Sequence, residues 1–162
     1  MDNTYYLKKA IELAQTSLDK GSVPIGALIV DINGNILAQG FNEIKISNDP
    51  TAHGEVVCMR QAKEKILTKF NQEPTFLFTT LEPCFACGFF ITRTNIKNVI
   101  WALDDPYKGG IDYLKNTEKL KNDFKNINLV SEPNLEIKNM SKELMKTYYL
   151  KKGDLKVAEL FS

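Results

Sequence analysis

The sequence predicts one α/β domain, spanning residues 1–162, in which helices cover both faces of a sheet. Short apolar runs typical of strands alternate along the chain with segments whose apolar residues recur at helical spacing. A length of 162 residues fits a single domain. The chain is 43% hydrophobic and 25% charged, which is the composition of an ordinary globular protein. We therefore expect one packed fold without an internal boundary.

The N-terminal part is predicted to form a helix followed by a β-hairpin. Residues 4–20 place apolar side chains at i, i+3 and i+4 spacing, and Gly21 is a suitable helix stop. Residues 25–30 and 36–41 are apolar runs on either side of an Asn-Gly pair. Because Asn-Gly accepts the positive φ angles of a tight turn, these runs predict two antiparallel strands.

The rest of the chain is predicted to continue the alternation of helices and strands. Residues 42–50 are expected as a loop, and Thr51 is the expected N-cap of a helix that runs to about residue 67. The later elements, in order, are a strand at 75–79, a helix at 84–93, a strand at 98–103, a loop at 104–112, an uneven helix at 113–122, a strand at 127–130 and a helix at 141–152.

We expect a cytoplasmic protein without a membrane partner. No apolar run reaches the length that spans a bilayer, and the N-terminal residues lack the apolar stretch of a secretory signal. The net charge of +1 argues against a dedicated nucleic-acid binder. However, residues 113–156 hold ten lysines against six acids. A solvated face is the ordinary explanation of this excess, and a shallow phosphate-contacting surface is the alternative.

Three candidate metal ligands stand in two short motifs. His53 is the only histidine, and Cys84 and Cys87 belong to the run Pro-Cys-Phe-Ala-Cys over residues 83–87. One imidazole and two thiolates suit zinc and leave its fourth position for water, as in catalytic sites. In a reducing cytosol, paired cysteines indicate metal ligands rather than a disulfide. A position at the start of the predicted helix also favours the thiolate forms.

Glu55 is the candidate proton carrier, because it follows His53 by two residues. A His-x-Glu motif followed by Pro-Cys-x-x-Cys is the signature of zinc nucleobase deaminases. Glu55 would take a proton from the zinc-activated water, pass it to a ring nitrogen and finally protonate the departing amine. On an ideal helix, His53 and Glu55 lie about 200° apart. The two side chains can therefore converge only if the first helical turn points end-on into the site.

With these motifs, the sequence resembles the cytidine deaminase-like superfamily, which includes tRNA adenosine, guanine and cytosine deaminases. The resemblance runs from the first helix to about Leu103 and includes residues 23–27, 40–42, 49–55 and 80–84. It implies a three-layer α/β/α sandwich around a five-stranded mixed sheet, commonly in a homodimer. It also implies one zinc ion per subunit, held by His53, Cys84 and Cys87, with Glu55 as the proton shuttle.

Three further residues are candidates for substrate binding. Asn42 matches an asparagine that hydrogen-bonds the base in these families, although asparagine also suits a left-handed turn. Gly54 stands where tRNA adenosine and guanine deaminases usually carry alanine and cytosine deaminases carry glycine. Glu82 could contact the substrate or cap the Cys84 helix. After Leu103 the resemblance fades, and Phe161 or Glu159 near the C-terminus could cover the pocket.

These observations support three hypotheses for the function. The first is deamination of a nucleobase or nucleoside, with cytosine-like substrates slightly ahead of guanine, because of Gly54 and the near-zero charge. The alternative is editing of adenosine to inosine at the wobble position of a tRNA, because residues 81–84 resemble those enzymes and residues 113–156 are basic. The minor alternative is a zinc-stabilised binding module without catalysis, which would have no use for Glu55.

Overall fold

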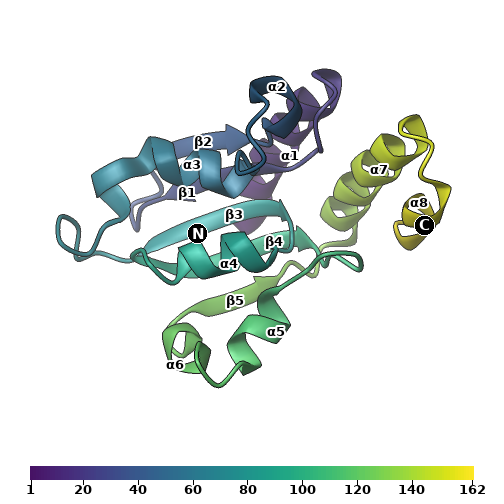
Figure 1. The fold of residues 1–162 in the computed structure, drawn as a ribbon. Coiled ribbons are helices and arrows are strands. Elements are labelled where there is room, and N and C mark those ends of the chain that lie inside the picture. The colour runs from purple at the N-terminus through teal and green to yellow at the C-terminus, as the bar shows by residue number, and fades with distance from the viewer.

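The computed structural model describes residues 1–162 and contains a five-stranded mixed sheet (Figure 1). The strands occur in the spatial order β2-β1-β3-β4-β5. β1 pairs antiparallel with both β2 and β3, whereas β3, β4 and β5 are parallel. Their bounds are Gly26–Val30, Ile36–Phe41, Thr75–Leu81, Ile96–Leu103 and Asn128–Ser131 for β1 to β5.

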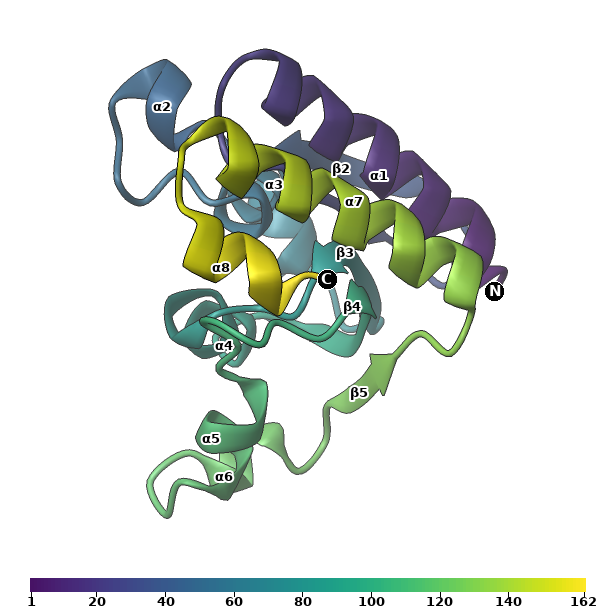
Figure 2. The same ribbon diagram turned by 90° about the vertical axis from the view of Figure 1, so that its right-hand side faces the viewer.

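Helices cover both faces of the sheet, which confirms the predicted α/β/α architecture (Figures 1 and 2). α1 and α7 lie on one face, and α3 and α4 lie on the other. The helix bounds are Asn3–Asp19 for α1, Ile44–Ser47 for α2, Gly54–Ala62 for α3, Phe85–Ile91 for α4, Ile111–Asn116 for α5, Lys121–Phe124 for α6, Leu135–Lys151 for α7 and Leu155–Leu160 for α8. No helix is both long enough and apolar enough to cross a membrane.

Alternate residues of β1 build the two cores. Ala27 and Ile29 pack under α3 and α4, whereas Leu28 and Val30 pack under α1 and α7. Every residue of β1 is buried, because the strand lies inside the sheet with helices on both sides. This explains why the run over residues 26–30 is continuously apolar rather than alternating.

The helix expected from Thr51 to residue 67 is shorter than predicted. Asp49 accepts hydrogen bonds from both the backbone N–H and the hydroxyl of Thr51, which holds Thr51 in a turn before the helix. His53 is the N-cap instead, and α3 ends at Ala62 because Lys63 has a φ of 51°. A short 3₁₀ helix, Lys63–Ile66, follows. The expected loop at 42–50 also contains the single-turn helix α2.

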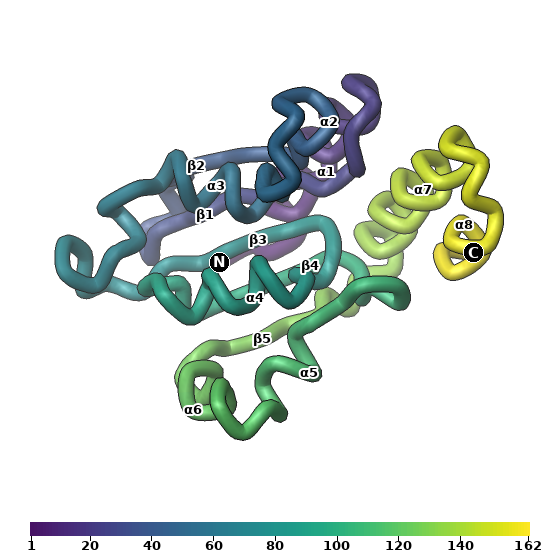
Figure 3. Tube along the Cα trace, in the orientation of Figure 1, coloured from purple at the N-terminus to yellow at the C-terminus, as the bar shows by residue number.

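The C-terminal region is more helical than predicted. α7 begins six residues before the expected start, because the Asn134 side chain accepts hydrogen bonds from the N–H groups of Glu136 and Ile137. Gly153, with a φ of 77°, lets the chain reverse after α7. The chain then forms α8, which the sequence analysis missed and which folds back beside α7 (Figures 2 and 3). The uneven helix expected at 113–122 forms as two short helices, α5 and α6.

Candidate metal centre and active site

The three predicted ligands meet at one end of the sheet. His53 is the N-cap of α3, Cys84 is the N-cap of α4, and Cys87 lies in the first turn of α4. The Nδ1 atom of His53 is 3.5 Å from the Cys84 sulfur and 3.6 Å from the Cys87 sulfur. All three ligand atoms lie within 4.8 Å of one another. Residues that are about thirty positions apart in the sequence therefore form one cluster.

The donor geometry fits a tetrahedral zinc ion. With Zn–N near 2.05 Å and Zn–S near 2.3 Å, a tetrahedral angle places nitrogen and sulfur about 3.5 Å apart. The two observed nitrogen–sulfur distances agree with this value. A hydrogen bond from Cys87, aided by His53, lowers the pKa of Cys84 to about 4. The same hydrogen bond, together with burial, raises the pKa of Cys87, so Cys84 is the thiolate of the pair and zinc binding would release the proton of Cys87.

Glu55 lies beside the ligands, and its carboxyl group is almost completely buried. The Oε2 atom is 3.5 Å from the Cys87 sulfur, and 3% of the residue is exposed. Burial is the main cause that raises the pKa of Glu55, to about 7. The 200° separation from His53 does not arise, because His53 precedes the helix in an extended conformation with φ −66° and ψ 150°. Both side chains therefore point toward the same end of α3.

A cavity of about 140 Å³ opens beside this cluster. Its lining includes five of the predicted site residues: Asn42, His53, Glu55, Glu82 and Cys84. The other lining residues were not selected from the sequence as site residues: Val23, Ile25, Ile44, Leu81, Asp105, Lys108, Met145 and Tyr149. Five of these, Val23, Ile25, Leu81, Met145 and Tyr149, belong to an apolar cluster that α7 and α8 share with the strand ends.

Glu82 and Gly54, the other two residues predicted to bind the substrate, both lie against the backbone of neighbouring segments. Both carboxylate oxygens of Glu82 accept backbone hydrogen bonds, from the N–H of Asp105 and of Ile111, so Glu82 holds the loop after β4 at the cavity edge. Gly54 does not line the cavity. A Cβ atom at Gly54 would lie 2.9 Å from the carbonyl oxygen of Ile25, so glycine allows α3 to approach this backbone closely. Both residues contact the backbone of neighbouring segments, and substrate binding by Glu82 and Gly54 stays a prediction.

Phe161 packs behind the cavity wall rather than into the cavity. Its ring stacks on that of Tyr149 with centroids 5.9 Å apart and an angle of 7° between the planes. Phe161 is buried, whereas Glu159 is exposed on the outer face of α8. The C-terminal helix therefore supports Tyr149, which itself lines the cavity. A helical pattern over residues 155–160 is too short to have revealed this from the sequence.

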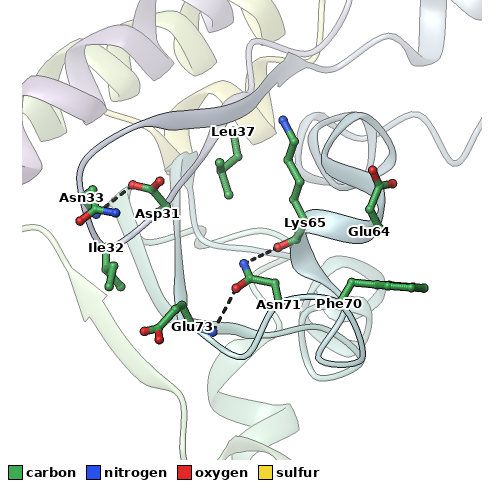
Figure 4. Close-up of a pocket in the computed structure, with 9 residues that line it drawn as sticks. All are labelled: Asp31, Ile32, Asn33, Leu37, Glu64, Lys65, Phe70, Asn71 and Glu73. Carbon is green, nitrogen blue, oxygen red and sulfur yellow. Dashed lines mark hydrogen bonds between the residues drawn. The ribbon is translucent and has the colours of Figure 1, made fainter.

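A larger cavity of about 310 Å³ lies at the opposite end of the sheet (Figure 4). It forms between the β1–β2 turn and residues 64–73, and Asp31 and Glu73 lie on its rim. Asp31 is already occupied, since it accepts hydrogen bonds from Asn33 and Asn35 within the turn. Because no histidine or cysteine lines it, this cavity lacks the chemistry of the first.

The fold and the His-Cys-Cys-Glu cluster define a zinc-dependent hydrolase of the α/β/α class. Residues 1–103 match the family model of the cytidine and deoxycytidylate deaminase zinc-binding region. This match covers more than half of the chain, and the chain therefore belongs to this family of hydrolytic deaminases. The resemblance that the sequence motifs indicated is confirmed.

Similar proteins act on tRNA or on a free base. The chain is 36% identical over 111 residues to the tRNA-specific adenosine deaminase of Aquifex aeolicus, which covers 68% of this chain and 72% of the relative. It is 37% identical over 115 residues to the guanine deaminase of Bacillus subtilis, with 69% and 72% covered. A solved tRNA:A34 deaminase has a TM-score of 0.68 and 26% identity, over 81% of this chain and 98% of that chain.

Proposed function

We propose that this deaminase converts adenosine to inosine in the anticodon of a tRNA. The observation that carries the proposal is the likeness to tRNA adenosine deaminases in both sequence and structure. The sequence motifs alone favour a cytosine-like or guanine-like base first and tRNA second. The comparisons favour the second hypothesis, and the relatives described above act on tRNA adenosine and guanine, which are purines, rather than on cytosine.

The size and opening of the cavity are compatible with a single base that enters from outside. Its volume of about 140 Å³ is below the roughly 300 Å³ of a typical small-molecule pocket. A base within RNA would enter it after leaving its stack, as base-flipping enzymes require. The ribose and phosphates would then lie at the rim, where Lys108 lines the cavity and the adjacent Tyr107 is 45% exposed.

Within the cavity, the residues of this chain divide the chemistry between them. His53, Cys84 and Cys87 would hold the zinc ion, which lowers the pKa of a water molecule to about 7 and so supplies hydroxide. Glu55 would accept one proton of the water and deliver it to a ring nitrogen of the purine. It would then carry the second proton, from the hydroxyl group added to the ring carbon, to the departing amine, which leaves as ammonia. The burial of Glu55 suits this role, because it raises the pKa of the carboxyl group and so favours return of the proton to the substrate.

The second candidate is deamination of free guanine, which the likeness to the Bacillus subtilis guanine deaminase favours. A free base would also fit the cavity, and it would need no contact outside the rim. The two candidates differ in their dependence on salt. Because RNA binding releases counterions, the affinity for a tRNA should fall steeply as salt increases, whereas the affinity for guanine should change little.

One experiment separates these candidates. The purified protein is incubated with an anticodon stem-loop that carries adenosine at the wobble position, and in parallel with guanine, cytosine, adenine and their nucleosides. Inosine formation is measured by nuclease digestion and chromatography, and ammonia release is measured for the free compounds. We expect inosine in the stem-loop and at most slow ammonia release. Rapid turnover of guanine with an unmodified stem-loop would overturn the tRNA proposal in favour of the second candidate.

We further propose one zinc ion per subunit, a homodimer and a cytoplasmic location. Phe85, Phe89 and Phe90 are between 42% and 46% exposed on α4, beside the metal ligands. Near Phe90, an apolar groove of about 420 Å³ runs along α3. Exposed aromatic clusters of this kind mark interaction surfaces, and a second copy of the chain would cover this one. Sedimentation analysis should show a dimer, and Phe89→Lys should shift it toward monomer.

A further inference from the structure

The side-chain amide of Asn42 is held in one orientation by a backbone group. The N–H of Ile44 lies 3.2 Å from Asn42 Oδ1 and can only donate a hydrogen bond. The atom that faces it must therefore be the amide oxygen and not the amide nitrogen. Asn42 has no positive φ, so it does not serve a left-handed turn, which was the alternative explanation for its presence.

Ser22 provides a second donor to the same oxygen. Its hydroxyl lies 2.8 Å from Asn42 Oδ1 and accepts a hydrogen bond from the N–H of Lys45 at 3.3 Å. Because Oδ1 has no hydrogen, the single hydroxyl hydrogen of Ser22 must point to it. Ser22 is fully buried, and 1% of Asn42 is exposed. Two donors thus occupy the two lone pairs of the amide oxygen.

The amide nitrogen of Asn42 is left for the cavity. Asn42 lines the cavity, and no protein group accepts a hydrogen bond from Nδ2. The only fully buried side-chain nitrogen or oxygen atoms without a hydrogen-bond partner are Thr79 Oγ1 and Ser131 Oγ. Nδ2 also lacks a partner but is not one of these buried atoms. The nitrogen is therefore accessible from the cavity, and a ligand there meets a hydrogen-bond donor.

We propose that Ser22 is a positioning residue that makes Asn42 an obligate donor to the substrate base. This inference rests on the proposed deaminase function of the cavity. It defines one feature of the substrate: the base must present an acceptor, a ring nitrogen or a carbonyl oxygen, to Asn42. A base that presents an N–H group there would meet two opposed donors and bind poorly.

A simple structural role for Ser22 makes a different prediction. In that case Ser22 would only join the segment before β1 to the start of α2, and its loss would affect the fold rather than the substrate. Ser141 provides a matched control for this role. It is also buried and donates a hydrogen bond of 2.6 Å, but to the carbonyl oxygen of Thr80. Ser141→Ala should lower the melting temperature and leave KM unchanged.

The test is a double-mutant cycle with Ser22→Ala, Asn42→Ala and the double variant. Steady-state kinetics are measured on the adenosine stem-loop and on guanine, and zinc content is measured for each variant. Ser22→Ala should raise KM about three- to tenfold with little change in kcat, which is the effect of one buried hydrogen bond on binding. In the Asn42→Ala background, Ser22→Ala should have no further effect on KM, because Ser22 acts through Asn42. Zinc content should be the same in all variants.

The outcomes separate the inference from the proposed function. Equal effects of Ser22→Ala with and without Asn42 would overturn the inference, and so would an unchanged KM in Ser22→Ala when Asn42→Ala raises it. The same double-mutant cycle can be measured without catalysis. For this, the Ser22→Ala and Asn42→Ala substitutions are made in the Glu55→Gln protein, and binding of the stem-loop and of guanine is measured by calorimetry. If the wild-type chain neither binds nor deaminates either compound, the proposed function fails, and the inference fails with it.

Discussion

Replacing Glu55 with glutamine should abolish most of the deaminase activity while the metal site remains intact. Glutamine has the size and shape of glutamate, and its amide group can occupy the place of the carboxyl group, whose Oε2 lies 3.5 Å from the Cys87 sulfur. The ligand atoms should therefore keep their places. What the substitution removes is a group that can accept and release a proton.

The magnitude follows from that single loss. A positioned proton carrier contributes about a hundred- to ten-thousandfold to the rate, which corresponds to about 2.7–5.4 kcal/mol of activation free energy. We expect kcat to fall by at least a hundredfold. Folding should not suffer, because Glu55 is buried and the substitution replaces an ionisable side chain with a neutral one. The melting temperature of Glu55→Gln should be equal to or above that of the wild-type protein.

The assay combines three measurements on one preparation: the ratio of zinc to protein by mass spectrometry, single-turnover deamination, and thermal unfolding. Glu82→Gln is the matched control, because Glu82 also lines the cavity but is bonded to backbone N–H groups. It should lower kcat less than tenfold, through a looser loop. A Glu55→Gln protein with full zinc and a kcat within tenfold of wild type would remove Glu55 from the proposed mechanism.

Three further predictions concern the supports of the site. Removal of zinc with a chelator should lower the melting temperature, because the metal joins the starts of α3 and α4; an unchanged melting curve would contradict this. Gly54→Ala should raise KM about five- to tenfold, since its Cβ would lie 2.9 Å from the Ile25 oxygen and displace Asn42; wild-type kinetics would show that the backbone absorbs the methyl group. Phe161→Ala should cost about 3 kcal/mol in urea unfolding, and a loss below 1 kcal/mol would show that Tyr149 needs no support.

Local patterns were sufficient to predict most of the fold. The Asn-Gly turn, the apolar runs of the strands and the helical spacing of residues 4–20 all act within a few neighbouring residues. Element boundaries depended on contacts that these patterns do not contain. Asp49 accepts hydrogen bonds from Thr51, and the N-cap of α3 lies two residues later than predicted, at His53. The early start of α7 depends on the Asn134 cap. The sequence did not indicate this cap, because Asn134 follows Pro133 in a polar stretch.

The metal cluster was predictable because each half of it lies within one short motif. His53 and Glu55 flank the first residue of α3, whereas Cys84 is the N-cap of α4 and Cys87 lies in its first turn. The N-terminus of a helix fixes the direction of the side chains around it, so local sequence was enough to select three candidate ligands whose ligand atoms lie together. How the first turn could bring His53 and Glu55 together was not predictable, because it depends on His53 lying outside the helix.

The specificity half of the site has no such motif, because its residues come from segments far apart in the chain. Asp105 follows β4, Tyr149 lies in α7, and both line the cavity, whereas Ser22 precedes β1, is fully buried and contacts the cavity residue Asn42. The positions of all three therefore depend on the packing of the whole sheet. Each of them also has a structural partner: Asn42, the Tyr107 N–H and Phe161, respectively. A motif common to several deaminases can therefore define the chemistry, while under the proposed function the choice of base would depend on these separate contacts. For this reason, substitutions at Ser22 and at the residues that support Tyr149 should change substrate preference more than substitutions at the metal ligands, which should abolish activity on every substrate alike.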